Sequence, residues 1–122
     1  MTNNQEFFYR FNEAFSRSDS GYIIAQVTDD IIWNMVGESI IRGKEEFTKS
    51  IKAMESESTH EFKINHMITH GKTAAVDGIM KVTDKSGKVK IYAFCDIYLL
   101  SSHKDGKIKE MTSYVVETDN AE

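Results

Sequence analysis

Hydrophobic residues recur at intervals of three and four positions near the start of the chain. Phe7, Phe8, Phe11 and Phe15 fall on one stripe, and polar residues occupy the positions between them. This spacing is typical of an amphipathic helix, here over Gln5–Arg17, with one apolar face turned to a core.

The hydrophobic period then changes twice. Residues 18–21 break the first helix and offer caps to a short second one over Tyr22–Val27. The β-branched and aromatic run Ile31–Val36 predicts a strand. Helical spacing returns after Gly43, and the apolar face of this third helix comprises Phe47, Ile51 and Met54.

The second half of the chain reads as strands joined by short turns. A loop is expected at Glu55–Ser58, and a frayed tail at Thr118–Glu122. The four strands between them are His60–His70, Thr73–Thr83, Lys88–Ser101 and Ile108–Glu117. Helices first and a meander afterwards predict a single α+β domain over residues 1–122, with the helices packed on an antiparallel sheet.

Composition and charge exclude several classes of function. The 122 residues include no proline and carry a net charge of −4, so a nucleic-acid partner, which needs a basic face, is not expected. The apolar runs are much shorter than the roughly 18 residues of a membrane span, and the polar N-terminus does not resemble a signal peptide. A single cysteine, Cys95, fits a reducing compartment, so we expect a cytoplasmic protein.

The strand over Ile91–Leu100 is apolar on both of its faces. An antiparallel strand with one wet face should alternate between apolar and polar residues. Cover on both faces requires helices on one side and something else on the other. A second copy of the sheet in a homodimer satisfies this requirement, and a loop over the outer face is the alternative.

Asp96 lies within this apolar strand, where an unpaired carboxylate is costly. The side chain is therefore paired, protonated with a raised pKa, or directed at a polar cavity. A functional acid has the same properties, and so does a core aspartate bonded to a tyrosine or histidine of a neighbouring strand.

His66 shares the parity of apolar positions in its strand and is expected on the inner face. A pair of His66 with Asp96 would form an acid/base unit, whereas a core histidine bonded to its neighbours is the alternative. His66 and His70 are about 13 Å apart along a strand, too far to chelate a metal together. His60 and His103 are interpreted as exposed turn residues, and we expect no metal and no cofactor.

The order and spacing of these elements resemble the NTF2-like superfamily, and within it the SnoaL-like and ketosteroid-isomerase-like proteins. The resemblance covers about Gln5 to Glu117, and its individual motifs are short. It rests on Phe11–Phe15, Asp29–Trp33, Gly43–Phe47 and Asp105–Ile108. It implies a cystatin-like cone in which three helices pack on a curved, mostly antiparallel sheet around a pocket for a small apolar molecule, often in a homodimer.

The resemblance to ketosteroid isomerase carries over only in part. That enzyme uses an aspartate base, a tyrosine and a protonated aspartate. The protonated aspartate would fall on Asp96. The tyrosine would fall near Phe11 and the base near Met35 and Asn34, none of which has the required group. Steroid isomerisation is therefore not expected.

The resemblance still implies an interior pocket. Its expected lining, besides Asp96, is Phe11, Phe15, Trp33, Met35, Phe94, Tyr98, Met111, Ser113 and Val115. Our first hypothesis is a ligand-binding SnoaL-like protein with isomerase- or cyclase-like acid/base chemistry through Asp96 and His66. A non-catalytic module for ligand binding or protein association is the second hypothesis. A dimerisation domain in which these large side chains fill the core is the third.

Overall fold

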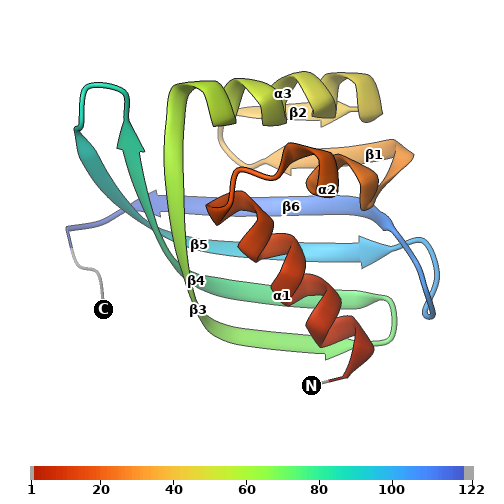
Figure 1. Ribbon diagram of the computed structural model, residues 1–122. Coiled ribbons are helices and arrows are strands. Elements are labelled where there is room, and N and C mark those ends of the chain that lie inside the picture. The colour runs from red at the N-terminus through yellow and green to blue at the C-terminus, as the bar shows by residue number, and fades with distance from the viewer. Residues whose placement is uncertain (1, 120–122) are drawn as a thin grey trace.

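The computed structural model describes residues 2–119 as three helices and a six-stranded sheet (Figure 1). The helices are α1 (Asn3–Ser16), α2 (Ser20–Ala25) and α3 (Lys44–Glu57). The strands are β1 (Val27–Met35), β2 (Ser39–Arg42), β3 (Ser58–His70), β4 (Thr73–Asp84), β5 (Val89–Leu100) and β6 (Ile108–Glu117).

The sheet has the order β2-β1-β6-β5-β4-β3. All neighbours are antiparallel except β1 and β6, the first and last strands, which are parallel. The sheet is curved and open, and the helices lie across one face of it (Figure 1). We call this face the inner face and the opposite one the outer face. The predicted α+β class, with three helices on a curved, mostly antiparallel sheet, is confirmed.

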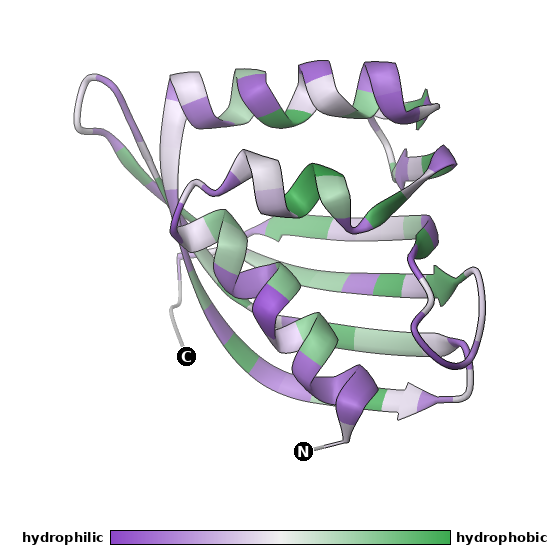
Figure 2. Ribbon diagram, turned by 45° about the vertical axis from the view of Figure 1, so that its right-hand side comes forward, coloured by the Kyte–Doolittle hydropathy of each residue, from purple (hydrophilic) through white to green (hydrophobic). Residues whose placement is uncertain are grey.

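Helix α1 begins two positions earlier than the hydrophobic stripe indicates, because a capping box fixes its start. The Thr2 hydroxyl accepts from the backbone N–H of Gln5, and the Gln5 side chain accepts from the backbone N–H of Thr2. Phe8 and Phe11 are fully buried under the helix. The hydropathy colouring of Figure 2 shows the alternation of faces along α1.

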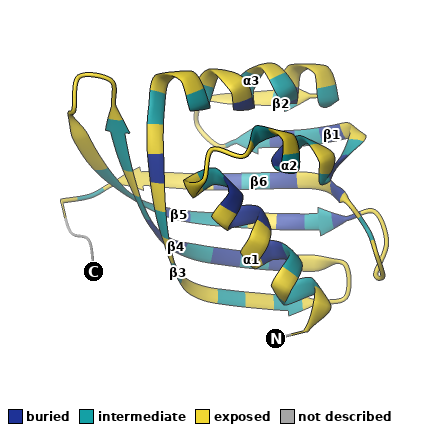
Figure 3. Ribbon diagram, viewed as in Figure 1, coloured by how far each residue is buried: buried dark blue, intermediate teal, exposed yellow. Residues whose placement is uncertain are grey.

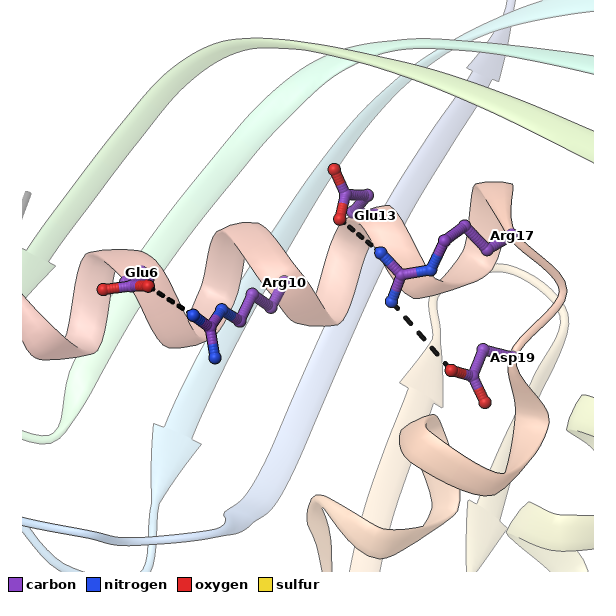
Figure 4. Close-up of polar contacts among 5 residues, drawn as sticks. All are labelled: Glu6, Arg10, Glu13, Arg17 and Asp19. Carbon is purple, nitrogen blue, oxygen red and sulfur yellow. Dashed lines mark hydrogen bonds and ion pairs between the residues drawn. The ribbon is translucent and has the colours of Figure 1, made fainter.

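The solvent face of α1 carries a row of ion pairs (Figure 4). Glu6 pairs with Arg10 at 2.6 Å, Glu13 pairs with Arg17, and Arg17 also approaches Asp19 at 4.0 Å. All five side chains are about half exposed or more. Exposed pairs of this kind contribute about 0.3–0.5 kcal/mol each, so the buried face of α1 does most to hold it in place.

Several elements differ from the sequence prediction. Helix α2 lies two residues earlier than expected, and β1 begins at Val27, which was predicted to be helical. The short strand β2 was not predicted, and it pairs with β1 at one edge of the sheet through Ile40 and Ile41. Helix α3 continues through the expected loop at Glu55–Ser58 as far as Glu57, after which β3 begins directly. The serine and glutamate residues there are compatible with a helix end that packs beside the sheet.

Strands β3 and β4 are bent, and their pairing contains an irregularity (Figure 1). Their register shifts between Ile64 and His66, which is a β-bulge. Gly78 lies opposite Ile64, and a Cβ atom there would be 2.0 Å from the carbonyl oxygen of Lys63. Only glycine therefore allows the two backbones to approach as they do.

The C-terminal strand ends near the β4–β5 hairpin, which is largely exposed (Figure 3). The backbone N–H of Thr118 donates to the carbonyl of Ile91 at 2.9 Å, so the expected frayed tail does not begin at Thr118. The remainder of that prediction, residues 120–122, lies outside the described residues. Within residues 2–119, no helix has the length and hydrophobicity needed to cross a membrane.

Candidate functional site

A cavity of about 500 Å³ lies between α1, the end of α3 and the inner face of the sheet. Its ring-bearing lining residues are Phe15, Trp33, Phe62, Tyr92 and Phe94. Four of its lining residues are methionines, namely Met35, Met54, Met80 and Met111. A largely apolar wall with few polar groups is characteristic of a small-molecule site.

The cavity has a buried inner end and an exposed outer end. Asn12, Trp33 and Ser113 at the inner end are almost completely buried. Glu38, in the turn after β1, and Val115 on β6 are exposed and form part of the mouth. A ligand would therefore enter past the β1–β2 turn and reach the polar groups last.

The sheet register brings Asp96 to the inner end. Asp96 on β5 lies opposite Ser113 on β6, which lies opposite Met35 on β1. The neighbour of Asp96 on β4 is the buried Val76. The carboxyl group thus lies in the middle of the sheet with an apolar wall on one side and a hydroxyl on the other.

One set of hydrogen bonds reaches Asp96 from β1 and β6. The indole Nε1–H of Trp33 donates to Ser113 Oγ at 2.9 Å. The Ser113 hydroxyl in turn hydrogen bonds the Asp96 carboxyl group. Because the indole is a donor only, Ser113 keeps its own hydrogen for the carboxylate.

A second set reaches Asp96 from α1. Asn12 Nδ2 donates to the carbonyl of Phe8 at 2.8 Å and to Tyr98 Oη at 3.3 Å. Tyr98 Oη donates to Asp96 Oδ2 at 3.2 Å. Burial, followed by the charge of Asp96, raises the pKa of Tyr98 well above its usual range, so this hydroxyl keeps its proton.

The protonation of Asp96 reflects competing effects. Burial raises its pKa to about 6, against the hydrogen bonds from Ser113 and Tyr98, which lower it. Desolvation disfavours the charged form, and donors to the carboxylate favour it. A carboxyl group with a pKa of about 6 can both accept and release a proton near neutral pH.

The cavity brings together most of the residues that the sequence indicated. Those in its wall are Phe15, Trp33, Met35, Phe94, Asp96, Met111, Ser113 and Val115. Phe11 and Tyr98 do not line it. Both are fully buried and pack against each other between α1 and the sheet, with ring centroids 6.0 Å apart.

His66 is not part of the cavity, and the expected pair with Asp96 does not form. The bulge in β3 reverses the parity of the strand, so His66 faces outward with its side chain 74% exposed. Its Nδ1 lies 2.8 Å from Oδ1 of Asp77, on the outer face of β4. The interpretation of His60 was also wrong, because it is buried on β3 and burial lowers its pKa.

Several cavity residues were not identified from the sequence. They include Asn12, Met54, Phe62, Met80 and Tyr92. Asn12 could have been found, because it is the one polar residue at helical spacing between Phe8 and Phe15 on the apolar stripe. Among residues 2–119, no three histidine, cysteine, aspartate or glutamate side chains are grouped so that they could hold a metal ion.

Solved structures of NTF2-like proteins and related enzymes share this fold. An NTF2-like protein of unknown function from Burkholderia pseudomallei is 18% identical, with 95% of this chain and 92% of that chain covered and a TM-score of 0.81. An LEH-like epoxide hydrolase of M. tuberculosis is 21% identical, with 87% and 77% covered and a TM-score of 0.76. SalBIII, an epoxide hydrolase/cyclase-like enzyme of pyran ring formation in the polyether salinomycin, is 19% identical, with 95% of both chains covered and a TM-score of 0.79.

The family itself follows from the sequence. The model of the SnoaL-like domain matches residues 8–111, and the chain belongs to this family. A search of curated proteins gave no significant match. The match spans α1 to the first half of β6, and so it includes the strands that carry Trp33 and Asp96.

Proposed function

We propose that this SnoaL-like protein binds a small, largely apolar molecule in the cavity and exchanges a proton with it through Asp96. The observation that carries the proposal is the position of one carboxyl group, with its pKa near 6, at the inner end of an apolar cavity. Such a group suits the acid/base steps of an isomerase- or cyclase-like reaction. A volume of about 500 Å³ lies within the usual range of small-molecule sites.

Binding can be tested by NMR of methyl-labelled methionine. Met35, Met54, Met80 and Met111 line the cavity, so their methyl resonances should shift when small ring compounds are titrated. Met67 lies on the inner face but outside the cavity wall and serves as the control within the molecule. A ligand panel that moves no cavity methyl group, or moves Met67 equally, would contradict the proposal.

Catalysis is tested separately from binding. With any compound that the wild type converts, Asp96→Asn should lower kcat by about 100-fold or more, the usual contribution of general acid/base catalysis. Ligand shifts of the cavity methyl groups should remain. Unchanged turnover in Asp96→Asn would favour the second candidate, a non-catalytic binding module.

We also propose that the chain forms a homodimer through the outer face of its sheet. Apolar side chains exposed there by between 42% and 66% are Ile68, Ile97, Tyr114 and Val116. The register places Ile97 in line with Ala75 and Ile68, so they form a continuous patch. Such a patch on a twofold partner would be self-complementary.

The dimer is tested by sedimentation velocity at micromolar concentration. The wild type should sediment as a dimer, and Ile97→Glu should shift it toward the monomer, because the charge would be buried at the contact. A wild-type monomer at this concentration would contradict the proposal. The cavity lies on the other face, so Ile97→Glu should leave the ligand-induced methyl shifts unchanged.

A further inference from the structure

The direction of every hydrogen bond around Asp96 is fixed by two groups at the ends of the network. The carbonyl of Phe8 can only accept, so the amide nitrogen of Asn12 must face it. The indole N–H of Trp33 can only donate, so Ser113 Oγ must accept from it. Neither assignment depends on which way an amide or hydroxyl is drawn.

These two fixed ends determine in which direction the hydroxyl groups between them donate their hydrogens. Asn12 Nδ2 gives its second hydrogen to Tyr98 Oη, and Tyr98 gives its own hydrogen to Asp96. Ser113 gives its hydrogen to the same carboxyl group. Tyr98 and Ser113 are therefore both donors to Asp96, and the donors at the inner end are all used within the protein.

What remains for a ligand at the inner end is a set of acceptors. Asn12 lines the cavity with its Nδ2 bonded twice, so its amide oxygen is the atom left to contact a ligand. Asp96 in its ionised form also offers only lone pairs. A carbonyl or ether oxygen brought to this place would meet oxygen atoms without a hydrogen between them.

We propose that the cavity selects its ligand through a hydroxyl or N–H group directed at Asp96 and Asn12, and discriminates against a ligand whose only polar atom there is a carbonyl or ether oxygen. This inference rests on the proposed function, because it specifies the class of molecule that the same cavity binds. An apolar alcohol has the required combination of an apolar body and one donor.

The arrangement also determines where a proton on Asp96 would go. Tyr98 donates to Asp96 Oδ2, so an added proton on the other carboxyl oxygen could be donated to a carbonyl oxygen in the cavity. Selection for a donor should therefore weaken when Asp96 is protonated. Because burial raises the pKa of Asp96 to about 6, this change falls between pH 7.5 and pH 5.

Other titratable groups near the cavity are distinguishable from Asp96. Tyr92 on β5 lines the cavity, but it is four residues from Asp96, about 13 Å along the strand. Glu38 is at the exposed mouth. His60 on β3 is two strands away from β5, and its partner on β4, Val82, pairs with Lys90.

The test compares two saturated two-ring probes of the same shape, decahydro-2-naphthol and 2-decalone. Their affinities are measured from the shifts of the methionine methyl groups of the cavity. At pH 7.5 the alcohol should bind about ten-fold more tightly or better, as expected for a hydrogen bond to a charged group. At pH 5 the ratio should fall to about three-fold or less, because protonated Asp96 then donates to the ketone.

Substitutions test whether Asp96 causes the pH-dependent preference for the alcohol. In Asp96→Asn, the preference for the alcohol should be smaller and independent of pH, since the amide adds a donor and does not titrate. Asp77→Asn is the matched control, a carboxylate on the outer face of the neighbouring strand, and it should retain the wild-type ratios at both pH values. A pH dependence that disappears in Glu38→Gln and persists in Asp96→Asn would overturn the inference.

If Asp96→Asn fails to fold, the binding of the two probes to the wild type alone still tests the inference. Binding of both probes with equal affinity at pH 7.5, or tighter binding of the ketone, would overturn this inference and leave the proposed function intact. Failure of both probes to move the cavity methyl groups at millimolar concentration would overturn the proposed function and this inference with it.

Discussion

Asp96 and Asp77 lie on neighbouring strands of one sheet, yet the two carboxylates have opposite surroundings. Asp96, on the inner face of β5, is bonded to two hydroxyl groups beside an apolar cavity. Asp77, on the outer face of β4, is 43% exposed and bonded to a histidine. The same residue type is thus a candidate acid in one place and a hydrogen-bond partner of a surface histidine in the other.

The difference shows that the face of the sheet determines the chemistry. Asp77 lies opposite Cys95, the residue directly before Asp96, so the two carboxylates are one step apart along the ladder. Helices cover the inner face, where Asp96 is partly buried in the cavity wall and desolvation raises its pKa. The separation depends on an uninterrupted alternation along β4 and β5 and on the bulge that directs His66 outward.

The largest expected effect on stability comes from a substitution that disrupts the close pairing of β3 with β4, on which the separation of the two faces depends. Gly78→Ala would place a Cβ atom 2.0 Å from the carbonyl oxygen of Lys63, and we expect the free energy of unfolding to fall by about 3 kcal/mol or more. Chemical denaturation measures this change. Gly21→Ala in α2 is the control, because its nearest neighbour would be 3.9 Å away, and it should stabilise by about 0.5–1 kcal/mol. Equal stability of the two variants would contradict our account of the bulge.

The second effect is a pH dependence of the unfolding free energy that we expect from Asp96. The pKa of Asp96 is raised from 3.8 to about 6 on folding, so the folded state binds more protons between these values. Its contribution to stability is therefore fully present below pH 3.8 and is lost as the pH rises through 6. Relative to Asp96→Asn, the wild type should lose about 2 kcal/mol between pH 4.5 and pH 8.

Urea denaturation at a series of pH values tests this prediction. The difference in unfolding free energy between wild type and Asp96→Asn should slope downward with pH. A flat difference for Asp96→Asn would mean that burial does not raise the pKa of Asp96.

A third, smaller effect tests the hydrogen bonds at the inner end. Ser113→Ala removes a donor to the carboxylate and should raise the pKa of Asp96 further, as seen in a carboxyl ¹³C NMR titration. It also leaves the indole N–H of Trp33 without its acceptor, at a cost of about 1–3 kcal/mol. Thr112→Ala, on the outer face next to Ser113, is the control and should leave the titration of Asp96 unchanged. A lowered pKa in Ser113→Ala would contradict the proposed direction of this bond.

The smallest effect concerns the outer pair. His66→Gln should change the unfolding free energy by less than about 1 kcal/mol, because exposed pairs contribute little. It should leave ligand binding unaltered, in contrast to any change at Asp96. Thermal denaturation and the methionine methyl spectra measure the two outcomes, and a loss of ligand binding would show that the two faces are coupled.

Much of the fold could be predicted from the sequence, because strong periodicity marks α1 and the four long strands. Alternation could not place Asp96, because β5 is apolar on both faces, and its inner position was indicated only by the resemblance to ketosteroid isomerase. His66 was placed wrongly because alternation was extended across Asn65, where the bulge adds a residue. The signal for the bulge is in the partner strand, at Gly78, and only the pairing of β3 with β4 connects the two.

Other errors at the candidate site arise from packing between distant segments. Tyr98 has the predicted parity, but α1 covers it, so it supports Asp96 from behind and does not line the cavity. Met54 and Met80 come from α3 and β4, and their meeting depends on the curvature of the sheet. The short β2 has four residues and pairs with one neighbour, too little for a periodic pattern.

The parallel pairing of β1 with β6 has a consequence for the order in which the molecule can form. Trp33 and Met35 on β1 pair with Met111 and Ser113 on β6, which come about eighty residues later in the chain. The wall at the inner end of the cavity needs both strands. During synthesis, the antiparallel part from β3 to β5 can assemble before β6 has left the ribosome. Because β6 joins β1 to β5, the complete sheet and the wall of the cavity both depend on the last strand.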